Sequence, residues 1–153
     1  MSVNCNNKDK ETLKLYIVRH GETEWNVIKR FQGQLNTPLT EKGMKKLGET
    51  GKKLKNILFD QVYTSELERT VNSAEIILNE NNGYKNNKLE LQKLAELNEV
   101  YFGVWQGLNY EEVFLKYPEE ANNYFYNVKN YKAENVEAEN LKDALERFLK
   151  GIN

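Results

Sequence analysis

The chain has little of several residues that would point to particular classes of protein. Its 153 residues include one cysteine, Cys5, and one histidine, His20. A single cysteine excludes an internal disulfide and fits a reducing compartment, so we expect a cytoplasmic protein. The apolar runs span only a few residues, too short for a membrane-spanning helix. Lysine plus arginine (22) nearly balance aspartate plus glutamate (23), so we expect no nucleic-acid partner and no membrane partner.

The composition otherwise indicates an ordinary globular domain. Charged residues make up 29% of the chain and hydrophobic residues 39%. Residues 1–12 are polar and contain no apolar core of a secretory signal, so we predict a flexible N-terminal extension there. Residues 13–153 are enough for one domain with its own core. The sequence leaves the oligomeric state open.

Apolar periodicity predicts strands that alternate with helices. The expected elements are a strand over 13–18, a helix after a turn at 37–40, a strand over 59–64, a helix from a capping box at 65–68, a polar loop over 81–87, a strand over 89–94 that also reads as helix, one or two helices over 109–127 around Pro118, and an amphipathic helix over 141–149. Such alternation predicts an α/β fold with three layers, α/β/α, around a mostly parallel sheet.

Apolar stripes at helical spacing support three of these helices. The stripe residues are Met44, Leu47, Gly51, Leu54 and Leu58 in the first helix, Leu67, Val71, Ala74 and Leu78 in the second, and Leu141, Ala144, Leu145, Phe148 and Leu149 in the last. We expect these stripes to face the core.

The most informative segment is the apolar run that ends in Arg19-His20-Gly21. The carboxyl ends of strands are where open α/β sheets place ligand sites. Arginine is a planar fork suited to phosphate, and a neutral imidazole is a nucleophile. The combination predicts phosphoryl chemistry on His20, although a lone histidine at a strand end is also read as a structural residue.

Four segments in order resemble the histidine phosphatase superfamily, also called the phosphoglycerate mutase-like family. The likeness covers nearly everything from Leu13 onward. The matching residues are Arg19-His20-Gly21-Glu22-Thr23 with Trp25-Asn26 and Phe31-Gln32-Gly33, then Leu39-Thr40-Glu41-Lys42-Gly43, then Tyr63-Thr64-Ser65-Glu66-Leu67-Glu68-Arg69-Thr70, and then Leu97-Asn98-Glu99 with Phe102-Gly103-Val104-Trp105-Gln106-Gly107-Leu108. The resemblance implies a phosphoglycerate mutase-like domain.

The resemblance also implies roles for individual residues. His20 would be the nucleophile that forms a phosphohistidine, and Glu99 would be the proton donor to the leaving group. Arg19, Asn26 and Arg69 would bind the phosphate. Three of these residues also have a structural alternative: Asn26 as a turn cap, Arg69 as a surface residue of a helix's first turn, and Glu99 as an exposed loop carboxylate.

Further implications concern the substrate and cofactors. Gln32, Gly33 and Phe102 would shape the substrate pocket, although an aromatic at such a position is as often part of the core. Arginines meet the phosphate charge, so we expect no metal and no cofactor. The expected partner is a small phosphorylated metabolite.

Specificity within the family favours the phosphatase branch. Mutases that handle phosphoglycerates carry a lysine two residues after the Gly-Leu of the acid-bearing loop, where this chain has Tyr110. They also carry a later arginine pair, whereas this sequence has no arginine between Arg69 and Arg147. A substrate carboxylate without a cationic partner binds poorly in a desolvated pocket. The sequence resembles more closely the small phosphatases of the family, including alpha-ribazole phosphatase-like enzymes.

One family feature is absent from the sequence. Family members continue from the last amphipathic helix into a core strand that ends in a second catalytic histidine, and His20 is the single histidine here. We therefore expect a domain that is truncated before that histidine and lacks one core strand at the C-terminus, beside the strand over 13–18. The expected function is phosphomonoester hydrolysis in impaired form. The alternatives are a non-catalytic phosphate-binding remnant and a phosphoglycerate mutase.

Overall fold

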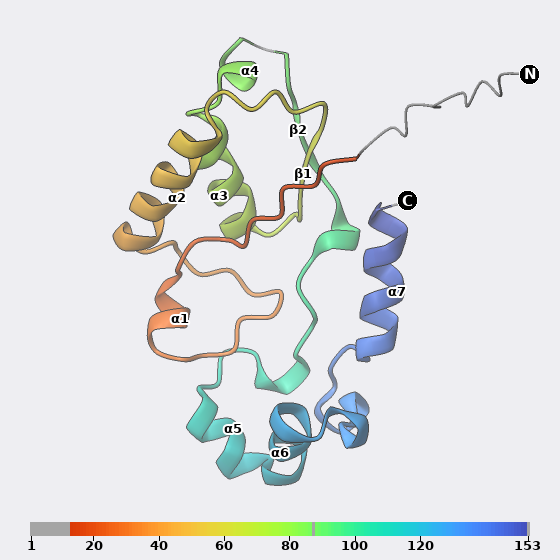
Figure 1. Ribbon diagram of the computed structural model, residues 1–153. Helices are drawn as coiled ribbons and strands as arrows, with labels where there is room; N and C mark the ends of the chain where they lie inside the picture. Colours follow the sequence, from red (N-terminus) through yellow and green to blue (C-terminus); the bar gives the residue numbers. More distant parts are fainter. Residues whose placement is uncertain (1–12, 87, 153) are drawn as a thin grey trace, which may run out of the picture.

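A computed structural model describes residues 13–86 and 88–152 of the chain. Figure 1 shows an elongated arrangement, with α2, α3 and the strands toward one end and α5 and α6 at the other. The helices are α1 (Glu24–Val27), α2 (Glu41–Leu54), α3 (Glu68–Leu78), α4 (Asn82–Lys85), α5 (Tyr110–Lys116), α6 (Pro118–Tyr126) and α7 (Leu141–Ile152), and the strands are β1 (Val62–Thr64) and β2 (Leu91–Lys93). Short 3-10 turns lie at Ala95–Leu97, Gly103–Trp105, Val128–Asn130 and Ala133–Val136.

The described sheet consists of β1 and β2 in parallel. Val62 lies opposite Leu91, and Thr64 lies opposite Lys93. The connection between the two strands runs through α3 and α4, as a parallel pair requires. The predicted strands over 59–64 and 89–94 and the α/β alternation are therefore confirmed, with shorter strands than the sequence predicted.

The prediction of a strand over residues 13–18 is wrong in this structure. The segment is outside helix and sheet, and no described residue pairs with its backbone as a ladder partner. Its apolar side chains are exposed, with Leu15 at 68% and Ile17 at 91%. Tyr16 makes an edge contact with Phe59, at 5.4 Å between ring centroids. A single run of apolar residues becomes a strand only when another strand satisfies its backbone. Among the described residues the sheet consists of β1 and β2, and neither pairs with this segment.

Two local predictions around the helix starts also need correction. The capping box at 65–68 is wrong, because α3 begins after Leu67, which makes no side-chain cap. Ser65 lies two residues too early and instead pairs its hydroxyl with that of Thr70 at 2.5 Å. The predicted loop over 81–87 contains α4, where the Asn81 side chain caps the amides of Gly83 and Tyr84.

Helices α2 and α3 pack side by side next to the strands (Figure 1). The predicted start of α2 is confirmed, since the Thr40 hydroxyl accepts from the Gly43 amide at 2.9 Å. Leu47 of α2 is buried, but Met44 and Leu58 of the expected stripe are exposed. The apolar stripe of α3 is largely buried, as expected, whereas in the stripe of α7 Ala144 is buried but Leu145 and Leu149 are 57% and 51% exposed.

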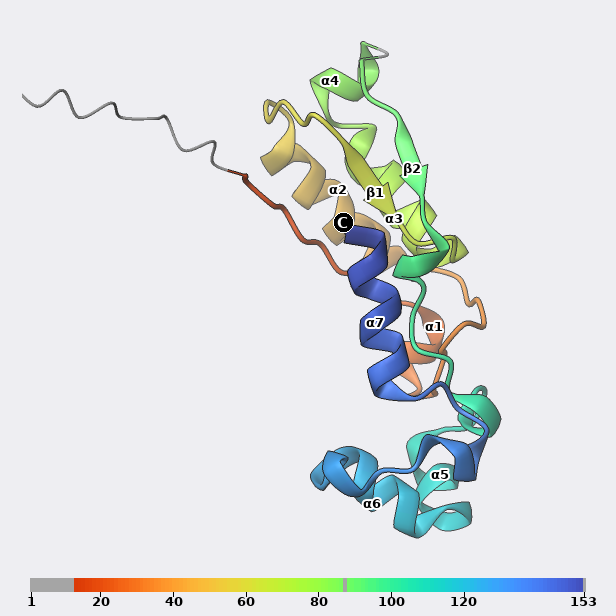
Figure 2. The same cartoon turned by 90° about the vertical axis from the view of Figure 1, so that its right-hand side faces the viewer.

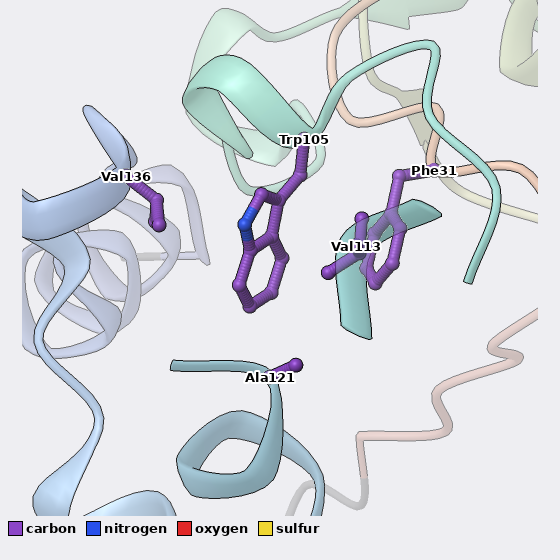
Figure 3. Close-up of a cluster of buried hydrophobic side chains, with 5 residues drawn as sticks. All are labelled: Phe31, Trp105, Val113, Ala121 and Val136. Carbon is purple, nitrogen blue, oxygen red and sulfur yellow. The ribbon is translucent and has the colours of Figure 1, made fainter. Parts of the chain in front are cut away.

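The aromatic core lies at the end of the molecule that carries α5 and α6. Its buried members are Phe31, Trp105, Val113, Ala121 and Val136 (Figure 3). The two helices predicted around Pro118 are confirmed, and Pro118 occupies the first turn of α6. From this end α7 runs back toward the strands (Figure 2) and packs on the turn at Ala95–Leu97. The described helices include none that is long and apolar enough to cross a membrane.

Candidate active site

His20 lies at the carboxyl end of the extended segment, with one ring nitrogen already engaged. Its Nδ1 is 2.7 Å from the carbonyl oxygen of Gly21. Because a carbonyl oxygen only accepts hydrogen bonds, this contact assigns the proton to Nδ1 and leaves the lone pair on Nε2. Burial lowers the pKa of His20 below its ordinary value of 6.5, and the nearby guanidinium groups of Arg69 and Arg19 lower it further. The Gly21 bond and the Glu99 charge oppose that shift without reversing it. The site therefore favours a neutral imidazole with a free Nε2.

The segment is tied to α3 immediately after His20. The Gly21 amide donates to the Ser73 hydroxyl at 3.0 Å, and that hydroxyl donates to the Arg69 carbonyl at 2.6 Å. A side chain on Gly21 would meet Leu47 of α2, at 2.7 Å from the new carbon. Close packing and one hydrogen bond thus fix the position of His20. Sequence reasoning missed Ser73, although it lies one helical turn after Arg69 and shares its face.

Arg69 is the most buried charged side chain of the site, with 2% of its surface exposed. Its Nη1 donates to the Leu35 carbonyl at 2.9 Å, and its Nη2 donates to the Gly33 carbonyl at 2.7 Å. Its Nε is buried and donates to no described residue. Burial lowers the pKa of Arg69 below the ordinary arginine value. A buried cation with an unused donor is costly, and an anion bound beside it would remove that cost.

Arg19 and Asn26 complete the predicted phosphate ligands. Both line a cleft of about 480 Å³ together with His20 and Tyr110. Arg19 is exposed, and its charge lowers the pKa of His20 and Arg69. The Asn26 Oδ1 accepts from the amide and the hydroxyl of Thr23, at 3.0 Å each, so its alternative role as a cap is present. Its amide nitrogen donates to none of the described residues and remains available for an oxygen ligand.

Glu99 belongs to the same site. Gln34, which bonds the Glu99 backbone, lies between Gly33 and Leu35, whose carbonyls accept from Arg69. The charge of Glu99 raises the pKa of His20 and of Arg69. Glu99 is half-buried, and its Oε1 accepts from the Val100 amide at 2.9 Å. Its carbonyl accepts from the Gln34 side chain at 3.1 Å. The exposed-loop alternative for Glu99 therefore does not describe its environment.

The loop that carries Glu99 is held by Arg147 of α7 and by Glu139, which lies just before that helix. The Arg147 Nη1 donates to the carbonyls of Glu96 and Asn98, at 2.8 Å each. Its Nε and Nη2 donate to the Glu139 carboxylate at 2.8 and 2.7 Å. Glu139 in turn exchanges hydrogen bonds with the backbone of Tyr101, at 2.8 and 3.2 Å. We call Arg147 and Glu139 the acid-loop clamp. Sequence reasoning missed the clamp because its members lie about 40 to 50 residues from the loop, as the separations of these bonds show.

The three predicted pocket residues are not among the residues that line the cleft of His20. Gln32 is buried, and its Oε1 accepts from the Thr23 hydroxyl at 3.0 Å. Gly33 has φ +54°, and a side chain there would collide with Gln106, so glycine is required at this turn. Phe102 packs edge-on against Phe31, at 5.2 Å between centroids. Contact of these three residues with a substrate stays a prediction, as does the absence of a metal requirement.

The site therefore combines one imidazole, two arginines and one carboxylate. The sequence profile described as the histidine phosphatase superfamily (branch 1) matches residues 15–153. Phosphoserine phosphatase 1 of Hydrogenobacter thermophilus is 38% identical over 108 residues, which are 71% of this chain and 48% of that protein. A 2,3-bisphosphoglycerate-dependent phosphoglycerate mutase of Blochmanniella floridana is 36% identical over 107 residues, 69% of this chain and 45% of the mutase.

Solved structures show the same fold. The structure of Bacillus stearothermophilus YhfR superposes with a TM-score of 0.78 at 29% identity, covering 88% of this chain and 62% of that one. The alpha-ribazole phosphatase from Shigella flexneri superposes with a TM-score of 0.75 at 27% identity, covering 88% of this chain and 63% of the phosphatase. The chain spans about half the length of the curated relatives it matches.

Proposed function

The chain belongs to the histidine phosphatase superfamily, and from that premise we propose that it hydrolyses phosphomonoesters through a phosphohistidine on His20. The names of its relatives, a phosphoserine phosphatase and a phosphoglycerate mutase, support phosphatase or mutase-type activity. The observation that carries the proposal is the pairing of His20, whose Nε2 is free, with Arg69, whose buried Nε has no described partner. One group attacks phosphorus, and the other binds a phosphoryl oxygen.

The proposed reaction has two steps at one phosphorus atom. His20 Nε2 attacks phosphorus, the bond to the ester oxygen breaks, and the proton-carrying form of Glu99 donates its proton to the departing alkoxide. Glu99 then accepts a proton from water, the water oxygen attacks phosphorus, and the phosphorus–nitrogen bond breaks. Inorganic phosphate leaves, and both side chains return to their starting states. Arg19, Asn26 and Arg69 hold the phosphoryl oxygens throughout.

Hydrolysis is favoured over the mutase alternative by the residue beside the cleft. A phosphoglycerate carries a carboxylate that needs a cationic partner. At the position where mutases of the family carry a lysine this chain has Tyr110, which lines the cleft with Arg19 and His20, and the lysine that also lines the cleft, Lys46, comes from α2. The sequence offers no arginine between Arg69 and Arg147 to take that part, and Arg147 is committed to the acid-loop clamp. We therefore assign the chain to the phosphatase side of the superfamily.

We further propose that a polypeptide of these 153 residues turns over slowly. The sequence contains a single imidazole, so the transition state has no second one to stabilise its charge. Removing one such donor typically costs about 10²–10³ in rate. Phosphate binding depends on the arginines and should survive. If turnover is too slow to measure, the chain acts as the phosphate-binding remnant that the sequence left open.

The test is hydrolysis of para-nitrophenyl phosphate by the chain and by its His20→Ala variant, with excess chelator present. We expect slow turnover that His20→Ala reduces to the uncatalysed rate. The matched control is Tyr63→Ala, a half-exposed tyrosine of β1 outside the cleft. Equal rates for the chain and His20→Ala would overturn the proposal. Rates typical of intact family members would overturn the part that concerns slow turnover, and loss of activity with chelator that magnesium restores would overturn the metal-free mechanism.

A further inference from the structure

We propose that residues 33–35, which we call the bridging segment, set the position of Glu99 relative to Arg69, and that Gln34 is a positioning residue for Glu99. The inference rests on the proposed function, because Glu99 is the group that would donate a proton to the leaving oxygen. It adds a residue that is not among those lining the cleft of His20, and on which proton transfer depends but phosphate binding does not.

The backbone of the bridging segment holds the buried arginine. The carbonyls of Gly33 and Leu35 accept from Arg69, at 2.7 Å from Nη2 and 2.9 Å from Nη1. Because a guanidinium is a rigid planar fork, two such bonds fix its orientation as well as its distance. We therefore treat Arg69 and the bridging segment as one unit.

Gln34 lies between the two carbonyls and bonds the loop that carries Glu99. Its side-chain amide donates to the Glu99 carbonyl at 3.1 Å, and its backbone amide donates to Oε1 of Gln106 at 2.7 Å. Gln106 can approach because Gly33 has no side chain, and a Cβ there would collide with the same oxygen. Gln106 follows the turn at Gly103–Trp105. The bridging segment thus bonds the acid-bearing loop at two separate points.

Hydrogen bonds also hold the residues on either side of the bridging segment. The Phe31 amide donates to the Leu108 carbonyl, and the Phe31 carbonyl accepts from the Gly107 amide, at 2.9 Å each. On the other side, the Asn36 Oδ1 accepts from the amide of Glu68, the first residue of α3, at 3.1 Å. The direction of the bridging segment is therefore fixed from both ends, which makes it suitable as a spacer.

The bridging segment has a different role from the acid-loop clamp. Arg147 and Glu139 bond the backbone before and after Glu99 and connect it to α7 and the residue before that helix. Gln34 bonds the carbonyl of Glu99 itself and leads within one residue to the ligands of Arg69. Since the Glu99 carboxylate accepts from the Val100 amide, a rotation of this backbone would carry the carboxylate with it. The bridging segment therefore sets the distance between the acid and the phosphate.

The test compares two substrates of similar size, phenyl phosphate and para-nitrophenyl phosphate. Phenolate is a stronger base than para-nitrophenolate, so its departure depends more on a proton from Glu99. Gln34→Met keeps the length of the side chain and removes the donor. It should lower kcat/KM for phenyl phosphate by about 10-fold and for para-nitrophenyl phosphate by less than about 2-fold, because the clamp still limits the displacement of the acid. Calorimetry should show an unchanged affinity for inorganic phosphate.

The matched control is Asn122→Leu, which also replaces an exposed side-chain amide by an apolar group. Asn122 lies on α6, and its amide donates to the Pro118 carbonyl at 2.7 Å. Both rates should stay unchanged in this variant. A second measurement needs no turnover, because the Val100 amide bonds the Glu99 carboxylate and its NMR signal reports where that group lies. The signal should shift in Gln34→Met and stay in place in Asn122→Leu.

The outcomes separate this inference from the proposed function. Equal losses for the two substrates, unchanged rates or an unchanged Val100 signal in Gln34→Met would overturn the positioning role and leave the proposed function intact. Weaker phosphate binding in Gln34→Met would also overturn it, because the bridging segment would then support the arginine rather than the acid. If the native chain hydrolyses neither substrate, the proposed hydrolysis fails, and the Val100 signal decides by itself whether Gln34 positions Glu99.

Discussion

The two sides of the site are held in different ways. The acid side is anchored by a network in which Arg147 and Glu139 of the acid-loop clamp bond the backbone before and after Glu99. The nucleophile side is an extended segment with exposed apolar side chains. It is attached to α3 by the hydrogen bond between the Gly21 amide and Ser73. Glu99, the proposed acid, is therefore preorganised by residues distant in sequence, whereas His20, the proposed nucleophile, depends on a few contacts at its own position.

The same contrast separates the two arginines. Arg69 is buried and directed by the carbonyls of Gly33 and Leu35, while Arg19 is exposed on the extended segment. A donor that is fixed and desolvated is worth more to a transition state than one that must be ordered on binding. Stability and catalysis are thus expected to respond differently to changes on the two sides.

The largest loss of activity should come from replacing Arg69, the buried arginine. Arg69→Met should lower kcat/KM for para-nitrophenyl phosphate by about 10²–10³-fold, because it removes a desolvated donor. Arg19→Met should lower it by only about 10-fold, the lower end of what a charge-assisted hydrogen bond contributes. Steady-state kinetics and phosphate binding check both values. A larger loss for Arg19→Met than for Arg69→Met would contradict the conclusion that the buried arginine contributes more to catalysis than the exposed one.

The next effect tests the acid-loop clamp. Arg147→Met should lower kcat by about 10- to 10²-fold, since a shift of about 1 Å in Glu99 is enough for such a loss. Phosphate affinity should change little, because the phosphate ligands lie outside the clamp. Lys142→Met is the matched control on α7, since it removes an exposed pair with Glu146 at 3.8 Å. An unchanged kcat, or equal losses in kcat and phosphate affinity, would show that Arg147 does not position the acid.

A smaller effect is expected at the attachment of the nucleophile. Ser73→Ala removes the acceptor of the Gly21 amide and should cost about 1 kcal/mol of unfolding free energy. Because little else holds the segment, amide exchange at Gly21 should accelerate more than exchange in α2. Chemical denaturation and hydrogen exchange measure the two quantities. Unchanged protection at Gly21 would mean that other contacts hold His20.

The smallest expected effect is a shift in the pKa of His20. His20 is the single histidine, so one ring-proton signal in NMR reports its titration. Burial lowers its pKa, so the midpoint should fall below 6.5, and bound phosphate should raise it because an anion favours imidazolium. The unfolded chain binds the proton more readily, so His20 should reduce stability as pH falls from 6.5 toward the folded pKa. A midpoint at or above 6.5 would contradict the environment described for His20.

The sequence predicted which residues would share one site better than it predicted the contacts that hold them there. The resemblance to the histidine phosphatase superfamily implied that Arg19, His20, Arg69 and Glu99 share one site, and the charges of these groups do act on one another in the structure. The pairing of Arg147 with Glu139 and its contacts to the acid loop depend on tertiary contacts that no local pattern encodes. A local rule also failed at Ser65. The Ser-x-x-Glu pattern is present in the sequence, but the helix begins after Leu67, so Ser65 is not its cap.

The strand predicted over residues 13–18 failed for a different reason. The apolar run was read correctly as extended, but a strand is a property of a pair of segments, and periodicity in one segment cannot supply the other. Helices α2, α6 and α7 were predictable because their signals are local: the Thr40 cap, Pro118 and the apolar stripe of 141–149.

The most direct test of the account is to find where the phosphoryl group is held. The chain is mixed with para-nitrophenyl phosphate, quenched in base, and analysed by 31P NMR and peptide mass spectrometry. Since Nδ1 is engaged by the Gly21 carbonyl, the account predicts one acid-labile phosphoryl group on Nε2 of His20, absent from His20→Ala. A phosphoryl group found on Nδ1 or on another residue would contradict this prediction. So would hydrolysis that forms no phosphoenzyme and survives His20→Ala.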